Sequence, residues 1–215
     1  MRSVLRGLGW TMISLGAFTL YFLVYQLVGT NHVTGQAQAE LRGELSQEFA
    51  VGAQPKAGKA KPKTEKPAAE GKAFALINIP KIKAEHVVVE GTSRDDLRKG
   101  PGHIVQSKMP GAKGTFAVSG HRTTYGGPFG NLDKLSKGDQ IIIRTKIATY
   151  TYEVSHSRVV LPTEVSVLDD VRGEDGKLRP TIVLTTCHPK FSAKQRLIVF
   201  GDLVSTKPVA SPAAA

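Results

Sequence analysis

Two kinds of apolar pattern divide the chain. Residues 8–28 form an unbroken apolar run of 21 residues without a formal charge, preceded by Arg2 and Arg6. As an α-helix this run would extend ~31 Å, which matches the ~30 Å hydrocarbon core of a bilayer. Basic residues favour the cytoplasmic side, so the pattern predicts a single membrane-spanning anchor. Residues 1–7 would then lie in the cytoplasm and the rest of the chain outside the cell.

A cleaved signal peptide is the competing interpretation of the same run. Residues 37–39 read Ala-Gln-Ala, which resembles a signal-peptidase site. However, the apolar run is longer than the usual stretch of about 7 to 15 residues and ends roughly eleven residues before that site. The pattern therefore favours the uncleaved anchor.

Residues 29–73 carry too little apolar bulk to predict a packed element. Within them, 40–50 could form a short amphipathic helix, whereas 51–73 consist mainly of Ala, Lys, Pro and Gly. Such a composition cannot bury enough surface to offset the entropy of ordering. We expect a disordered, positively charged spacer outside the cell, most simply a solvated tether, although its lysines could also touch anionic cell-wall polymers or lipid headgroups.

From residue 74 the pattern changes to short runs rich in Val, Ile, Thr and aromatic residues, with Gly and Pro between them. Two short helical stretches occur at 93–100 and 130–138, each closed by a Gly. The composition predicts an all-β barrel or sandwich over 74–206, followed by a disordered tail at 207–215. The candidate strands are 74–80, 86–90, 115–120, 140–145, 149–161, 181–187 and 196–204.

Composition and charge exclude several classes of protein. The single Cys rules out an internal disulfide and any Cys-rich zinc or iron–sulfur framework. The net charge of +11 is spread along the chain, with +6 of it in residues 74–206. No dense basic block is interleaved with aromatic residues, so nucleic-acid binding is disfavoured. A basic surface instead suits an anionic cell envelope.

The lone Cys187 is the first candidate for chemistry. It ends the apolar run 181–187, and Pro189 follows two residues later. A lone Cys is ordinarily a small buried hydrophobe. Outside the cell, however, an unpaired thiol is a liability unless it has a use, and a strand end at a barrel rim exposes its side chain. The position favours a functional thiol.

A thiol nucleophile needs a base and a group that stabilises developing negative charge. His121 closes the run 115–120 and so shares a strand-end position with Cys187. His188 should point to the opposite face from its neighbour Cys187. Arg196 opens the next strand, where antiparallel pairing would bring it beside the thiol. Arg122 and Lys194 compete with Arg196 for the role of the cation.

These residues resemble the sortase family of cysteine transpeptidases. The stretch Val183-Leu184-Thr185-Thr186-Cys187 is similar to the family's Thr-Leu-x-Thr-Cys strand end, with Arg196 on the next strand and SGHR some 65 residues earlier. The longer strings SGHRTTYGGPFGNLDKL and VLTTCHPKFSAKQRLIVFGDL are most similar to class E sortases of actinobacteria. The resemblance covers about residues 74–205.

The resemblance implies a closed eight-stranded sortase β-barrel and a two-step reaction on surface proteins at the membrane. Cys187 would cleave the Thr-Gly bond of a sorting signal and form a thioester, which an amine of a peptidoglycan precursor or a pilin Lys would resolve. His121 would be the general acid and base, and Arg196 would stabilise the oxyanion or hold the substrate. The substrate-binding residues implied by the same resemblance are Thr185, Thr186, Ile104 and Tyr125.

Several alternatives stay open. Class E members carry Tyr where this chain has Ile104, so the second signal position could be Pro or Ala. The acidic segment 162–180 could hold calcium, but a solvated loop without any cofactor is expected. A pilin-polymerising sortase is the rival within the family, and the chain has neither the second membrane segment nor the lid typical of that group. The interpretation as an L,D-transpeptidase is not supported, because the Ser-His-Gly-Cys stretch of that family is absent from this chain. The remaining alternative is a non-catalytic β-barrel binding module, in which Cys187 would serve only for packing.

Overall fold

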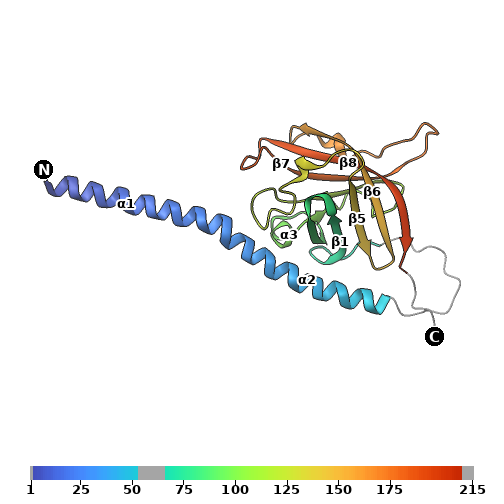
Figure 1. The fold of residues 1–215 in the computed structure, drawn as a ribbon, viewed down its shortest axis with the longest axis horizontal. Helices are drawn as coiled ribbons and strands as arrows, with labels where there is room; N and C mark the ends of the chain where they lie inside the picture. Colours follow the sequence, from blue (N-terminus) through green and yellow to red (C-terminus); the bar gives the residue numbers. More distant parts are fainter. Residues whose placement is uncertain (1, 53–65, 210–215) are drawn as a thin grey trace.

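The computed structural model describes residues 2–52 and 66–209, which form a closed β-barrel with a long helix at its N-terminal side (Figure 1). Around the barrel the strand order is β1-β2-β3-β4-β7-β8-β6-β5. The strands are β1 (Ala73–Ile79), β2 (Ala84–Glu90), β3 (Gly102–His103), β4 (Gly114–Ser119), β5 (Gln140–Thr145), β6 (Ala148–Val160), β7 (Pro180–His188) and β8 (Gln195–Pro208). The predicted eight-stranded barrel is therefore confirmed.

Alternation along the strands sorts side chains to the two faces of the barrel wall. On β7, Ile182 and Leu184 point inward and join the main core with Phe116 and Tyr152. Val183, between them, points outward. Burial of such side chains contributes about 1.5–3 kcal/mol each, so the interior is the main source of the barrel's stability.

All seven predicted strands are present, with ends shifted by a few residues. The sequence prediction missed β3, which has only two residues and pairs with β2 and β4. The barrel also extends past the predicted end at residue 206, because Lys207 and Pro208 still pair with β6. Residues 210–215 of the predicted tail lie outside the described residues.

The helical predictions were partly right. The first stretch is α3 (Arg94–Lys99), which begins with a capping box. Asp96 N donates to Ser93 Oγ, and Ser93 N donates to Asp96 Oδ2. The second stretch contains only the 3₁₀ turn η3 (Leu132–Lys134). Two further 3₁₀ turns, η2 (Pro80–Ile82) and η4 (Val165–Leu168), were not predicted.

The N-terminal apolar run is helical, as predicted. It forms α1 (Arg2–Val24), which is long and apolar enough to cross a membrane and projects away from the barrel in Figure 1. The π-helical turn η1 (Tyr25–Gly29) joins it directly to α2 (Thr30–Gly52).

Helix α2 corrects the prediction of a disordered spacer over 29–73. Its apolar side chains Leu41 and Leu45 pack against outward-facing Val87 and Val89 of β2 and against Ala73. This contact with the barrel supplies the burial that the isolated sequence lacks. Residues 53–65, the centre of the predicted spacer, lie outside the described residues, and Ala68 just after them packs against the barrel core.

Polar contacts also fix α2 to the barrel. The Gln38 amide nitrogen donates to Lys99 O and Val87 O, and its oxygen accepts from Val87 N. Thr34 Oγ1 donates to Arg98 O at 2.8 Å. Two carbonyls at the C-terminal end of α3, which have no partner within that helix, are thereby bonded to α2. An ion pair between Arg42 and Glu85 adds a charged contact with β2.

Candidate active site

Cys187 and Arg196 lie directly opposite each other on β7 and β8. The antiparallel register pairs these two residues next to the β7–β8 turn, as the sequence predicted. Residues directly opposite in an antiparallel pair place their side chains on the same face. Cys187 shares its face with outward-pointing Val183, so thiol and guanidinium both lie on the outside of the barrel wall.

His121 comes to the same end of the barrel from β4. This strand pairs in parallel with β7, with Ser119 opposite Thr185, and Gly120 N donates to Thr185 O at 3.1 Å. Continuing the register by two residues places His121 level with Cys187. His121, from a distant part of the chain, therefore comes to the end of the barrel at which Cys187 and Arg196 are paired.

Gly120 is required at this point because another side chain occupies the space beside it. A Cβ at this position would lie 2.7 Å from the Phe129 ring. Phe129 is fully buried, and its backbone N–H donates to His121 O at 3.1 Å. The loop after β4 is thus folded back onto the residue that precedes His121.

The His121 ring is half-buried and packs on Tyr125, with 4.9 Å between ring centroids. Burial disfavours the charged imidazolium and lowers the pKa of His121 below its ordinary value. Neutral imidazole, which can accept a proton, is therefore favoured.

Arg196 keeps donors available on the outer face. Its Nη1 donates to the carbonyl oxygens of Ala193 and Gln195, at 2.9 and 3.0 Å, which fixes the guanidinium in the β7–β8 turn. Within the described part of the chain no carboxylate pairs with it. Its remaining N–H groups could therefore bind an oxygen that acquires negative charge.

Arg122, the predicted competitor of Arg196, has a different environment. Its side chain is only 3% exposed and forms an ion pair with Asp133 at 3.2 Å. Its Nη1 donates to Cys187 O at 3.2 Å and to His188 Nδ1 at 2.8 Å. Arg122 thus holds the backbone of the strand end that carries Cys187. The sequence signal that could have shown this is alternation, which places Arg122 opposite to the face of His121.

The predicted substrate-binding residues fall into two groups. Thr185 shares the outer face with Cys187, and Ile104 packs against the outer apolar cluster of Ala117, Val160, Val167, Val183 and Ile198. The prediction that Thr186 lines the substrate groove is wrong. Thr186 is 2% exposed on the inner face, and its hydroxyl donates to Gly120 O at 2.8 Å. Its contact instead holds the loop that leads to His121.

The acidic segment 162–180 covers this outer cluster through Val167 and Leu168. Its carboxylates contact separate partners. Asp170 accepts from Thr115 N, Glu164 pairs with Arg158, and Asp175 pairs with Lys177. Within residues 2–52 and 66–209, no group of three His, Cys, Asp or Glu side chains is placed to hold a metal ion.

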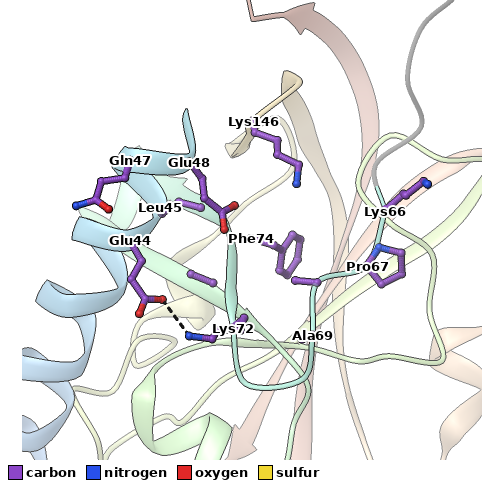
Figure 2. A pocket seen from close by; sticks show the side chains of 12 residues that line it. Glu44, Leu45, Gln47, Glu48, Lys66, Pro67, Ala69, Lys72, Phe74 and Lys146 are labelled. Atoms are coloured by element: carbon purple, nitrogen blue, oxygen red, sulfur yellow. Dashed lines mark ion pairs between the residues drawn. The ribbon is translucent and has the colours of Figure 1, made fainter. Parts of the chain in front are cut away.

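A hollow of about 800 Å³ opens elsewhere, between α2 and β1. Figure 2 shows Glu44 and Leu45 of α2 on one side, Phe74 of β1 at its centre and Lys66 on the far side. None of the residues that line this hollow in the described structure is a Cys or His. The hollow therefore lacks the thiol and imidazole that lie together at the end of β7.

Comparisons with known proteins agree with this geometry. Residues 77–204 match the sortase domain. The chain belongs to the sortase family. It is 37% identical over 214 residues to Sortase SrtE1 of Streptomyces coelicolor, covering 94% of this chain but 58% of that relative's length. It is 35% identical over 187 residues to Sortase D of Bacillus subtilis, covering 84% of this chain and 89% of that protein.

Solved sortase structures share the fold. The crystal structure of Sortase E1 from Streptomyces coelicolor with a tripeptide in the active site has a TM-score of 0.60 and 38% identity. It covers 64% of this chain and 91% of that one. These similarities confirm the class E resemblance inferred from the two motif strings.

Proposed function

We propose that this sortase is a membrane-anchored cysteine transpeptidase acting on Leu-Pro/Ala-x-Thr-Gly sorting signals. Its products would be surface proteins joined to a cell-wall peptide amine. The observation that carries the proposal is the pairing of Cys187 with Arg196 on the outer face, level with His121. Thiol, imidazole and guanidinium are sufficient for acyl transfer, so the proposed reaction needs no cofactor.

In the first step neutral His121 takes the proton of the Cys187 thiol, and the resulting thiolate attacks the carbonyl carbon of the signal's Thr. The oxygen acquires negative charge, which the free N–H groups of Arg196 stabilise. The Thr–Gly C–N bond then breaks, and the leaving amine takes a proton from the His121 imidazolium. A thioester between Cys187 and the signal's Thr remains.

In the second step an amine attacks the thioester carbonyl. Neutral His121 accepts the proton of the incoming amine, the new amide forms, and Cys187 leaves as thiolate. Burial already favours the neutral ring in the resting protein. The same residue thus serves as acid in one half-reaction and base in the other.

The signal would lie along the outer face of β4 and β7. Ile104 and Leu168 are partly exposed where they pack on the buried cluster of Val183 and Ile198, and they would supply an apolar surface for the residue that begins the signal. Thr185 and Tyr125 flank the thiol and the imidazole. Because Ile104 has no hydroxyl, we expect both Leu-Pro and Leu-Ala signals to be accepted.

Helix α1 supports a location at the membrane. We propose that it spans the bilayer once, with Arg2 and Arg6 in the cytoplasm and the barrel outside. Exported substrates would then pass close to the thiol.

The test measures the transpeptidase activity of the full chain in detergent micelles. The substrates are a Leu-Pro-x-Thr-Gly peptide and a Leu-Ala-x-Thr-Gly peptide, and the acceptors are a peptidoglycan stem peptide and a Lys-containing pilin peptide. We expect His121→Ala to lower kcat/KM by about 10²–10⁴-fold and Arg196→Ala by about 10²–10³-fold. His32→Ala and Arg94→Ala alter exposed side chains and serve as matched controls. Normal turnover in His121→Ala or Arg196→Ala would refute the role given to that residue.

A further inference from the structure

We propose that the N-terminal end of α2 positions His121 by holding the turn at Tyr125 and Gly126, with Asn31 as the principal positioning residue. The inference rests on the proposed function of His121. In this proposal, a segment outside the barrel helps to hold the candidate active site, although it lies 95 residues from the turn that it contacts.

The turn has a backbone that needs outside support. Tyr125, Gly126 and Gly127 have φ angles of 52°, 75° and 51°, all in the left-handed region. Glycine adopts this region readily, but Tyr125 carries a bulky side chain for which it is unfavourable. A non-glycine residue keeps such a conformation only where its surroundings impose it.

Helix α2 supplies these surroundings through two side-chain acceptors. Gly126 N donates to Asn31 Oδ1 at 2.8 Å, and Tyr125 N donates to Thr30 Oγ1 at 3.3 Å. Thr30 Oγ1 itself donates to Gln26 O at 2.6 Å, which leaves a lone pair for the Tyr125 amide. Two consecutive N–H groups of the turn are thus bonded to the start of α2.

The turn at Tyr125 and Gly126 determines the surroundings of His121. The Tyr125 ring packs on the His121 ring, and the Arg98 guanidinium of α3 lies 6.0 Å from the Tyr125 centroid. Arg98 O is itself bonded to Thr34 of α2. Losing the α2 contacts would release Tyr125 from His121, expose the imidazole to water and widen its range of positions.

The continuity of α1, η1 and α2 adds a consequence. The apolar run of the helix that we propose to cross the membrane ends at Val28, two residues before Thr30. The element that attaches the barrel to the bilayer therefore also holds the active-site turn.

The test compares Asn31→Ala, Asn31→Asp and Thr30→Val in the full chain in detergent micelles. Asp keeps an acceptor oxygen, whereas Ala at 31 and Val at 30 remove one. The control is Gln36→Ala, because Gln36 is exposed on the same helix and contacts His32. For each protein we would measure kcat, KM and the pKa of His121 by NMR of isotope-labelled histidine, assigned with His121→Gln.

We expect Asn31→Ala to lower kcat about 10-fold or more, since a shift of ~1 Å near the chemistry can cost up to ~10²-fold. The His121 pKa should rise towards its ordinary value as the ring gains water. Thr30→Val should act in the same direction, and Asn31→Asp and Gln36→Ala should resemble wild type. Unchanged kcat and unchanged His121 pKa in both Asn31→Ala and Thr30→Val would overturn the proposal.

The NMR measurement separates this inference from the proposed function. If wild type turns over and neither variant differs from it, the positioning role is wrong and the transpeptidase proposal stands. If wild type is inactive with every peptide but Asn31→Ala shifts the His121 pKa, the positioning contact is supported and the proposed reaction is refuted.

Discussion

His121 and Arg122 are adjacent in sequence and face opposite sides of the barrel wall. His121 lies on the outer face with Cys187, whereas the buried Arg122 bonds the carbonyl of Cys187 from within. The first is the acid and base of the proposed reaction, and the second fixes the strand end that carries Cys187. A buried Arg is tolerated here because Asp133, His188 and a backbone carbonyl contact its two terminal nitrogens, which leaves only Nε without a partner among the described residues.

Burial of two histidines makes stability depend on pH. Burial lowers the pKa of His121, and burial with a smaller contribution from the Arg42 charge lowers that of His86. The unfolded chain, with ordinary His pKa values of about 6.5, therefore binds more protons than the folded chain just below that pH. The free energy of unfolding should fall as the pH drops from 7.5 to 5.5.

Urea unfolding of the full chain at these two pH values measures the effect. His86→Gln and His121→Gln should each flatten the pH dependence, and the double variant should flatten it further. The window stays above the range where Glu85 titrates, since its hydrogen bond with Arg42 lowers its pKa from 4.5. The account would be contradicted if the free energy of unfolding rose towards pH 5.5. It would also be contradicted if the double variant kept the same pH dependence of the unfolding free energy as the wild type.

The pairing of Cys187 with Arg196 was predictable because each stands at the end of a recognisable strand. The catalytic roles of these residues and of His121 stay predictions. The sequence was misleading for Thr186, which was assigned to the groove by resemblance although alternation places it inside. The support that Asn31 gives the Tyr125 turn could not be predicted. It depends on a contact between segments 95 residues apart, and no local pattern encodes such a contact.

At the scale of elements, the strands were predictable because Val, Ile, Thr and aromatic residues recur at their positions between turn residues. β3 was missed because Gly102 and His103 show no alternation, and its pairing is imposed by neighbouring strands. Of helix α2, only residues 40–50 were expected to be helical, and its first part was missed because the composition there is polar. Its two leucines are both buried, and the stability of the helix depends on the barrel surface against which they pack.

Truncation of Leu45 tests whether helix α2 depends on its contact with the barrel. Leu45 is 1% exposed at the contact between α2 and the barrel. Leu45→Ala should cost about 2–4 kcal/mol of docking free energy through lost burial and the cavity left behind. Amide hydrogen exchange of α2 in the full chain should accelerate accordingly.

Leu161→Ala provides the matched control. Leu161 is 60% exposed, so its truncation should change stability by less than about 0.5 kcal/mol and leave α2 exchange unaltered. Equal exchange of α2 in the two variants would show that Leu45 does not hold the helix to the barrel.

At the scale of the whole molecule, one continuous helical segment connects the proposed membrane anchor with the candidate active site. An apolar helix continues without a break into α2, which docks along β1, β2 and α3 (Figure 1). The barrel is therefore held at a defined orientation to its N-terminal helix instead of swinging on a spacer. The spread of positive charge suits a protein that works beside anionic envelope polymers.

The central claim is that Cys187 forms a thioester with a sorting signal, and the mass of the intact chain measures it most directly. With a Leu-Pro-x-Thr-Gly or Leu-Ala-x-Thr-Gly peptide and no amine acceptor, the account predicts an adduct on Cys187. Its mass should equal that of the peptide up to Thr less one water, and hydroxylamine should remove it. Cys187→Ala should show none. Absence of an adduct with either peptide, or an adduct that persists in Cys187→Ala, would contradict the account.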